Sequence, residues 1–164
     1  MAKIKPPLPI IGWREWIAFP EFGIQAVNTK IDTGAKTSAL HAIHVEEFER
    51  DGQAMVHFEV HPLQRDSKIT AKCEAPLIEH RKVRSSNGQQ TKRPVVQVLI
   101  ELHGRRFPIE LTLTNRDEMG FRMLLGREAM RRRFVVDVNQ SYCDKTHVPP
   151  KKVRAKKRKV KKSK

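Results

Sequence analysis

Residues 10–138 are divided into short runs rich in Val, Ile, Phe and Thr, and Gly, Pro, Asn or Asp separates most runs from the next. Runs of this length and composition are typical of β-strands. Turn signals at intervals of about 8–12 residues favour an all-β barrel or sandwich. The expected strands occupy residues 10–19, 24–31, 53–60, 94–102, 106–114, 121–126 and 134–138.

Two of these runs form the clearest local motif. Residues 94–102 and 106–114 flank His103-Gly104-Arg105, which predicts a β-hairpin with a short glycine-containing turn. Helical patterns are scarce: residues 127–133 predict one short helix, and residues 35–40 are long enough for a single helical turn. The sequence therefore predicts a mainly β domain with one short helix near its C-terminal end.

The positive charge of the chain is concentrated at its C-terminus. Lys and Arg number 33 against 18 Asp and Glu, a net charge of +15, but residues 151–164 alone hold ten basic residues and no acidic one. Such a segment cannot build a core, so we expect a disordered tail over 149–164 that contacts RNA phosphates non-specifically. An anionic membrane surface is a weaker target, and a solubilising tail without a partner is the plain alternative. The expected organisation is an N-terminal extension (1–9), one folded domain (10–148) and the tail.

Several classes of protein are excluded by composition. No apolar run approaches the roughly 20 residues of a membrane-spanning helix, and Pro6, Pro7 and Pro9 interrupt the N-terminus before a signal-type apolar region can form. The two cysteines, Cys73 and Cys143, lie far apart in the sequence and support neither a disulfide scaffold nor a cysteine-based zinc site. We expect a protein of the reducing cytoplasm.

The strongest chemical motif is Ile31-Asp32-Thr33-Gly34-Ala35, in which a strand ends on an acid. A carboxylate at a strand end is held by the sheet and faces a cleft, Gly34 allows a tight turn, and the Thr33 hydroxyl can hold the loop by hydrogen bonding. The simpler interpretation is that Asp32 caps the turn at 35–40. A second motif favours the functional interpretation: residues 123–130, MLLGREAM, form an apolar run that closes on Gly-Arg and opens a helix.

With these two motifs the chain resembles the retropepsin-like aspartic proteases, which pair an apolar-Asp-Thr/Ser-Gly-Ala motif with a downstream apolar-apolar-Gly-Arg/Asn motif. The resemblance implies a closed β-barrel with a flap hairpin, expected within residues 79–97 because Ser85-Ser86-Asn87-Gly88 is a strong turn signal. The chain is similar in particular to the bacterial RimK-associated, RimB-like branch, often labelled ATP-dependent zinc proteases. The similarity covers about residues 10–140 and is carried by KIDTGAKTSALHA (30–42), VRSSNG (83–88), RPV (93–95), TNR (114–116) and LLGR (124–127).

The resemblance implies an aspartic endopeptidase with one Asp-Thr-Gly in each chain, so that two copies must pair Asp32 with Asp32 in a homodimer. Its expected substrate is an acidic polyglutamate tail that an ATP-grasp ligase adds to a small-subunit ribosomal protein. The residues expected at the site are catalytic Asp32, Thr33 and Gly34; supporting Ala35, Gly126 and Arg127; and, in the flap and substrate-binding region, Arg81, Arg84, Ser85, Ser86, Asn87, Gly88, Arg93 and Arg116.

One position departs from the wider retropepsin pattern. Many of those proteases carry an acid two residues after the glycine that pairs with the arginine of the Gly-Arg motif, but this chain has Lys36. Arg127 is therefore expected to pair with Glu128 or Asp137, and Lys36 is a candidate for attracting an acidic substrate.

The sequence contains no binding motif for the zinc ion or the nucleotide that the family label mentions. The sequence has no HExxH and no GxxxxGK[ST], and its histidines are expected to be structural or on the surface, so no cofactor or metal site is predicted. The main alternative function is a non-catalytic retropepsin-like binding module that serves as a ribosome- or RNA-associated adaptor. A metallopeptidase, which chelators would inactivate, is a distant third.

Overall fold

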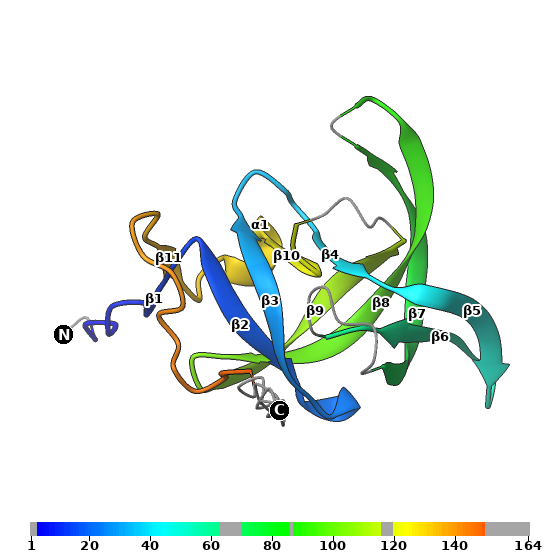
Figure 1. Cartoon of the computed structure of the whole chain (residues 1–164), viewed down its shortest axis with the longest axis horizontal. Helices are drawn as coiled ribbons and strands as arrows, with labels where there is room; N and C mark the ends of the chain where they lie inside the picture. The colour runs from blue at the N-terminus through cyan, green and yellow to red at the C-terminus, as the bar shows by residue number, and fades with distance from the viewer. Residues whose placement is uncertain (1–2, 63–69, 86, 116–119, 150–164) are drawn as a thin grey trace, which may run out of the picture.

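In the computed structural model, which describes residues 3–62, 70–85, 87–115 and 120–149, strands account for most of the chain (Figure 1). Besides the short 3-10 helix η1, α1 is the one helix among these residues. In chain order the elements are β1 (Ile10–Ile11), β2 (Arg14–Phe19), η1 (Pro20–Phe22), β3 (Ile24–Asp32), β4 (Ser38–His41), β5 (Ile43–Arg50), β6 (Gln53–Val60), β7 (Ala71–Arg84), β8 (Gln90–Leu102), β9 (Arg105–Thr114), β10 (Met123–Gly126), α1 (Arg127–Met130) and β11 (Val135–Val136).

Nine strands form one sheet in the order β2-β3-β10-β4-β9-β8-β7-β6-β5, and the sheet curls until it nearly closes. Ala18 of β2 pairs with Glu101 of β8, which links strands at the two sides of the curl. β10 runs parallel to β3, and β4 runs parallel to β9. The prediction of a mainly β chain with one short helix is confirmed.

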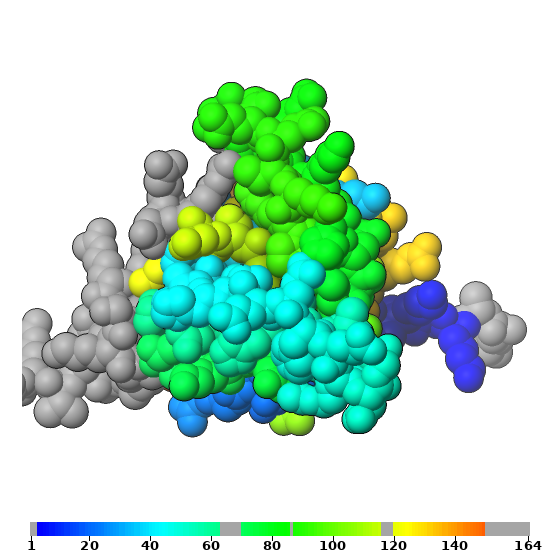
Figure 2. Space-filling model, turned by 90° about the vertical axis from the view of Figure 1, so that its right-hand side faces the viewer, coloured from blue at the N-terminus to red at the C-terminus, as the bar shows by residue number. Residues whose placement is uncertain are grey.

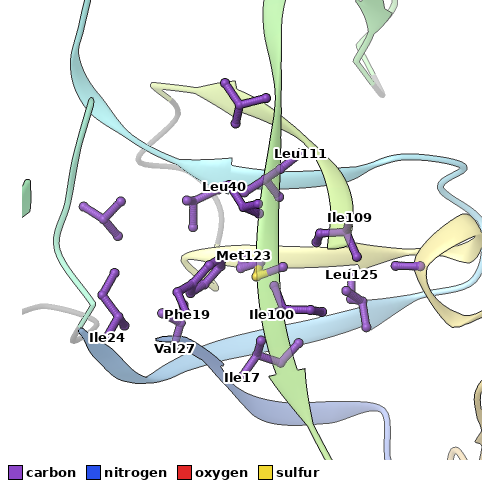
Figure 3. Packing of buried hydrophobic residues seen from close by; sticks show 14 of the residues in the cluster. Ile17, Phe19, Ile24, Val27, Leu40, Ile100, Ile109, Leu111, Met123 and Leu125 are labelled. Carbon is purple, nitrogen blue, oxygen red and sulfur yellow. The ribbon is translucent and has the colours of Figure 1, made fainter. Parts of the chain in front are cut away.

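The core fills the inside of this curl, where side chains from β2, β3, β8, β9 and β10 meet (Figure 3). Fully burying one such apolar side chain contributes about 1.5–3 kcal/mol, so this cluster is the main source of stability. Its fully buried members include Ile17, Phe19, Val27, Ile100, Leu111, Met123 and Leu125.

Residues 137–147, here called the strap, run along the free edge at the start of β2. Trp13 donates its backbone N–H to the Gln140 carbonyl (2.9 Å), and Tyr142 donates to the Arg14 carbonyl (2.9 Å). Further along, the Asp144 carboxylate accepts a hydrogen bond from the backbone N–H of His103, in the β8–β9 turn (2.7 Å). The strap therefore joins β2 to the β8–β9 turn, on the side where the strands themselves pair only at Ala18.

The local predictions had mixed outcomes. The strand expected at 53–60 matches β6, and the predicted hairpin is β8–β9, whose turn residues His103 and Gly104 both have positive φ (54° and 67°), as a tight hairpin turn requires. The single run expected at 10–19 is divided into β1 and β2, and β1 pairs with β11.

The prediction of a helical turn at residues 35–40 was wrong. Residues 38–41 form β4, which lies between β9 and β10 with all four residues buried. Ser38 and His41 concealed this strand, because a polar residue at each end interrupts the apolar pattern of a buried strand. β5 was not predicted, and β7 was predicted only where it enters the flap hairpin expected within 79–97, since both strands are largely polar.

No helix in the described parts of the chain is long and apolar enough to cross a membrane. Cys73 is buried, Cys143 is half-buried, and both are free thiols.

Candidate active site

The loop after β3 presents the Asp32 carboxylate at the surface. Asp32 Oδ1 accepts hydrogen bonds from the backbone N–H groups of Gly34 (3.0 Å) and Ala35 (3.2 Å). This is the local turn chemistry that the simpler interpretation expected of Asp32, although no helix follows. Asp32 is half-buried, whereas Thr33 and Gly34 are exposed. The carboxylate is thus fixed by its own loop and remains open to solvent on one side.

The start of α1 supports this loop from below through the backbone. The Arg127 N–H donates to the Ala35 carbonyl (2.7 Å), and the Glu128 N–H donates to the Lys36 carbonyl (3.1 Å). The Gly126 N–H donates to Ser38 Oγ (2.9 Å). The structure therefore brings Ala35, Gly126 and Arg127 together, as the sequence motifs predicted.

Position 126 requires glycine because the backbone of the loop after Asp32 packs directly against it. A Cβ atom on Gly126 would lie 2.6 Å from the carbonyl carbon of Thr37 and 2.9 Å from the carbonyl oxygen of Lys36. Both of these are backbone atoms, so no side chain can move aside to make room. The loop and the end of β10 pack this closely because residue 126 has no side chain.

Arg127 uses a partner that the sequence did not suggest. Its Nη1 donates to the Thr33 carbonyl (2.9 Å). Of the two expected acids, Glu128 pairs with Arg131 (3.1 Å), and Asp137 accepts hydrogen bonds from Asn139 and Gln140. With Lys36 in place of an acid, Arg127 holds the loop through a backbone carbonyl.

The predicted flap is the hairpin of β7 and β8, which projects above β5 and β6 (Figure 2). At its tip, Ser85 donates its backbone N–H to the Gln89 carbonyl (2.9 Å), and Gly88 donates to the Ser85 carbonyl (2.9 Å). Gly88 has a φ of 82°, which favours glycine. Asn87 contacts Ser85 at the same tip. Ser86 and Arg116 lie outside the described residues.

The register of the flap places its cations on two opposite faces. Arg81 lies directly opposite Arg93, and Lys82 lies directly opposite Lys92. Because side chains alternate along a strand, Arg84 shares the face of Lys82 and not that of Arg81. The basic residues predicted for substrate binding therefore divide into Arg81 and Arg93 on one face and Arg84 on the other.

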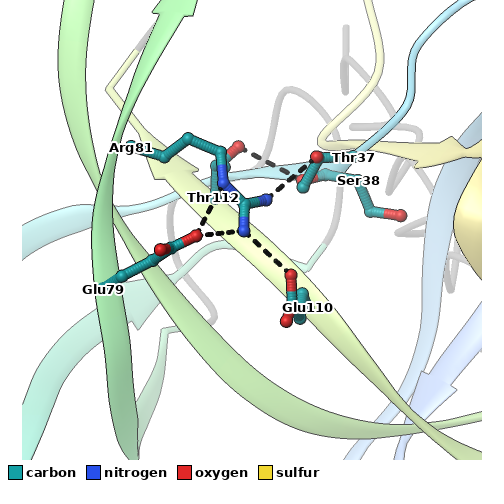
Figure 4. Close-up of polar contacts among 6 residues, drawn as sticks. All are labelled: Thr37, Ser38, Glu79, Arg81, Glu110 and Thr112. Atoms are coloured by element: carbon teal, nitrogen blue, oxygen red, sulfur yellow. Dashed lines mark hydrogen bonds and ion pairs between the residues drawn. The ribbon is translucent and has the colours of Figure 1, made fainter.

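Arg81 connects its face of the flap to the loop that follows Asp32 (Figure 4). Its Nη1 donates to Thr37 Oγ1 (3.1 Å), and its Nη2 pairs with Glu110 Oε2 of β9 (3.0 Å). Glu79 completes the cluster by pairing with the same guanidinium. The hydrogen bonds to Glu79 and Glu110 raise the pKa of Arg81. The sequence did not identify Thr37, Glu79 or Glu110, because the fold creates this contact between residues up to 44 positions apart.

Three of the histidines pair with acids: His44 with Glu59, His80 with Glu47, and His147 with Glu101. No group of three or more His, Cys, Asp or Glu side chains that could hold a metal ion occurs in the described ranges.

A model of the RimB-like family, described as retropepsin-like aspartic endopeptidase RimB, matches residues 10–147. Among curated proteins, the chain is 48% identical over 134 residues to a probable alpha-L-glutamate ligase of Shewanella pealeana, a match covering 82% of this chain and 29% of the ligase. It is also 48% identical over 128 residues to a protein of the same name from Desulfotalea psychrophila, covering 78% and 28%. The chain thus spans less than a third of these relatives.

Among solved structures, the fold is similar to the crystal structure of Lpg0085, a protein of unknown function from Legionella pneumophila. The TM-score is 0.72 at 28% identity, and the match covers 82% of this chain and 97% of the other.

Proposed function

Because the chain belongs to the RimB-like family of retropepsin-like aspartic endopeptidases, we propose that it cleaves peptide bonds as a homodimer in which the two copies each supply Asp32. The observation that carries this proposal is the Asp32 loop, held rigidly from below by Gly126 and Arg127 while Thr33 and Gly34 are exposed above. A single chain supplies one such carboxylate, and a twofold axis beside the loop would supply the second.

Two adjacent carboxylates share one proton because both cannot ionise at close range. The ionised carboxylate takes a proton from a water molecule as the water oxygen attacks the scissile carbonyl carbon. The protonated carboxylate donates its proton to the carbonyl oxygen. When the tetrahedral intermediate collapses, the C–N bond breaks and the leaving nitrogen takes up a proton. The flap would cover the peptide and exclude bulk water.

The substrate we propose is an acidic peptide, in particular a glutamate tail on a ribosomal protein. Two observations support an acidic substrate: the relatives that contain a similar segment are named glutamate ligases, and Arg93 lies on the face of the flap that Arg81 turns towards the loop after Asp32. Arginine binds carboxylates with two parallel hydrogen bonds. A peptidase acting beside a ligase would trim or remove what the ligase adds.

The names of the relatives also favour a second candidate, a non-catalytic module that holds the glutamate chain for a ligase. In such a module, Asp32 serves only to fix its own turn through the Gly34 and Ala35 N–H groups. This candidate predicts binding of acidic peptides without turnover.

The test is cleavage of a glutamate-tailed peptide by the full chain and by Asp32→Asn, followed by mass spectrometry, with and without a chelator. We expect chelator-resistant cleavage that the variant loses, and a dimer by analytical ultracentrifugation. Binding without cleavage in both proteins would favour the module, and a strictly monomeric active protein would reject the shared dyad.

A further inference from the structure

A cavity of about 600 Å³ lies behind the loop that follows Asp32. One wall is Lys36, Thr37 and Ser38 of that loop, and the base of the flap and β9 form another (Figure 4). The third wall is α1 and Arg133, and Asp32 itself does not line the cavity. Small-molecule sites commonly have volumes of about 300–1,000 Å³, so the space is adequate for a small ligand.

The acidic side chains that line this cavity already have partners. Glu79 and Glu110 both bind the Arg81 guanidinium. Glu128 pairs with Arg131, which lies outside the lining. Glu128 is thereby balanced by a cation of its own, whereas Glu79 and Glu110 share the single positive charge of Arg81, on the wall formed by the flap base and β9.

Two cations on different walls have no such compensation. Lys36 is exposed and takes part in no ion pair among the described residues. Within the same ranges Arg133 has no carboxylate partner either: its guanidinium lies over the Phe107 ring, 4.3 Å from the centroid, and Nη1 donates to the Ala129 carbonyl (3.5 Å). Both side chains retain hydrogen-bond donors for an anion.

We propose that this cavity binds a small dicarboxylate, with one carboxylate at Lys36 and the other at Arg133. Pro108, Ile109 and Ala129 supply apolar contacts for the methylene groups between the two charges. Two separate cations on different walls of the cavity match a doubly charged ligand better than a single anion. The site is distinct from the Asp32 carboxylate, although Lys36 belongs to the segment that α1 holds in place.

Free glutamate and the terminal glutamate of a peptide both present this chemistry. The choice of glutamate as the probe rests on the proposed function, whereas the dicarboxylate class rests on the cavity alone. Glutarate, which lacks the amino group, and lysine, which has a second ammonium group in place of the second carboxylate, provide the contrasts.

The test is isothermal titration calorimetry on the full chain carrying Asp32→Asn, a background chosen so that no probe is cleaved. The probes are free glutamate, glutarate, a peptide ending in two glutamates, and lysine. Lys36→Met and Arg133→Met, each added to this background, are expected to weaken glutarate binding about tenfold or more, as the loss of one charge-assisted contact implies. Lys145→Met and Arg50→Met remove cations that do not line the cavity and should leave binding unchanged. Circular dichroism verifies that each variant is folded.

Tighter binding of the free amino acid or of the peptide identifies the source, and either result supports the site. The proposal is overturned if glutarate and glutamate do not bind, if lysine binds equally well, or if the two cavity variants bind like their controls. Failure of the proposed function is separate: it would appear as absence of cleavage by the wild-type chain, while Lys36- and Arg133-dependent binding persists.

Discussion

Among the carboxylates that hold a turn of the chain by accepting backbone N–H groups, Glu15 and Asp32 have completely different surroundings. Glu15 of β2 is 0% exposed and accepts hydrogen bonds from Gly12 (3.0 Å), Cys143 (2.8 Å) and Asp144 (3.4 Å). Asp32 at the end of β3 accepts two such bonds and is half-buried at the edge of an exposed loop.

The difference indicates what each region is for. Around Glu15, one chain supplies every partner: the strap covers the carboxylate, and Tyr142 stacks on Trp16 with ring centroids 5.2 Å apart. Around Asp32 the chain supplies support from below and leaves the top open. A buried carboxylate whose oxygens are hydrogen-bonded stabilises the fold, whereas an exposed carboxylate on a supported loop is available for chemistry. Changes near Glu15 should therefore lower stability, and changes at Asp32 should abolish activity.

The largest expected effect is on catalysis. Asp32→Asn keeps an oxygen that can accept from Gly34 and Ala35 but removes the acid–base group, so cleavage should fall about 10²–10⁴-fold. The free energy of unfolding, measured in urea, should remain within about 0.5 kcal/mol of wild type. Undiminished cleavage by a folded variant would remove Asp32 from the mechanism.

The second prediction compares the two glycines beside these carboxylates. A Cβ on Gly12 would lie 2.3 Å from the Gln140 carbonyl oxygen, and a Cβ on Gly126 would lie 2.6 Å from the Thr37 carbonyl carbon. Each substitution to Ala should cost about 3 kcal/mol, since backbone must move in both cases. Only Gly126→Ala should also lower the cleavage rate of the molecules that remain folded.

Urea denaturation and peptide cleavage measure the two effects separately. The matched control is Gly120→Ala, because among the described residues no atom beyond its own chain neighbours lies within 4 Å of its Cβ position. Equal loss of specific activity in Gly12→Ala and Gly126→Ala would contradict the separation of the two regions.

Much of the fold could be predicted from residue patterns, because alternation marks strands that are buried on one face. β6 is the clearest case: Val56, Phe58 and Val60 are all 0% exposed and alternate with more exposed residues. β4 was missed because it is buried on both faces, so its sequence does not alternate, and because it carries the polar residues Ser38 and His41. The long β7 is mostly polar, because much of it lies in the protruding flap.

The candidate site was predictable where it is local in sequence. The Asp-Thr-Gly turn and the Gly-Arg that supports it were both found as motifs, and the structure places them in contact. The contact of Arg81 with Thr37 and Glu110 could not be found in this way, because it depends on how β7 curves over β9. The partner of Arg127 was missed because a backbone carbonyl leaves no trace in the sequence.

The third prediction tests the fastening at Glu15. In Glu15→Gln one carboxylate oxygen becomes an NH₂ group, which cannot accept a bond from the strap and leaves a buried donor facing another donor. The expected cost is about 2 kcal/mol. Because the remaining amide oxygen can still accept from Gly12 and Cys143, hydrogen exchange should show faster exchange of the Asp144 amide, while specific cleavage activity is retained. Glu49→Gln, at an exposed position of β5, is the matched control and should change neither quantity. Unchanged protection of the Asp144 amide would show that the strap does not depend on this carboxylate.

The smallest expected effect concerns how the free energy of unfolding depends on pH through Asp144, at the far end of the strap. Burial acts to raise the pKa of this carboxyl, but hydrogen bonds from Thr146 and from the His103 N–H outweigh it, and the pKa lies below the ordinary value. A lowered pKa in the folded state means that the ionised form stabilises the protein at pH values above the ordinary Asp pKa of about 4, and that this contribution is lost as the pH falls below it.

Asp144→Asn should therefore cost about 1 kcal/mol at pH 7 and progressively less towards pH 3, so that the stability curves of variant and wild type converge in acid. Urea denaturation at half-unit steps of pH measures this convergence. Asp51→Asn, in the exposed β5–β6 turn, is the matched control and should leave the curve parallel to that of wild type. Curves for Asp144→Asn that run parallel over the whole range would mean that the strap is held at this end by packing and not by charge, and the contrast with the Asp32 loop would then rest on Glu15 alone.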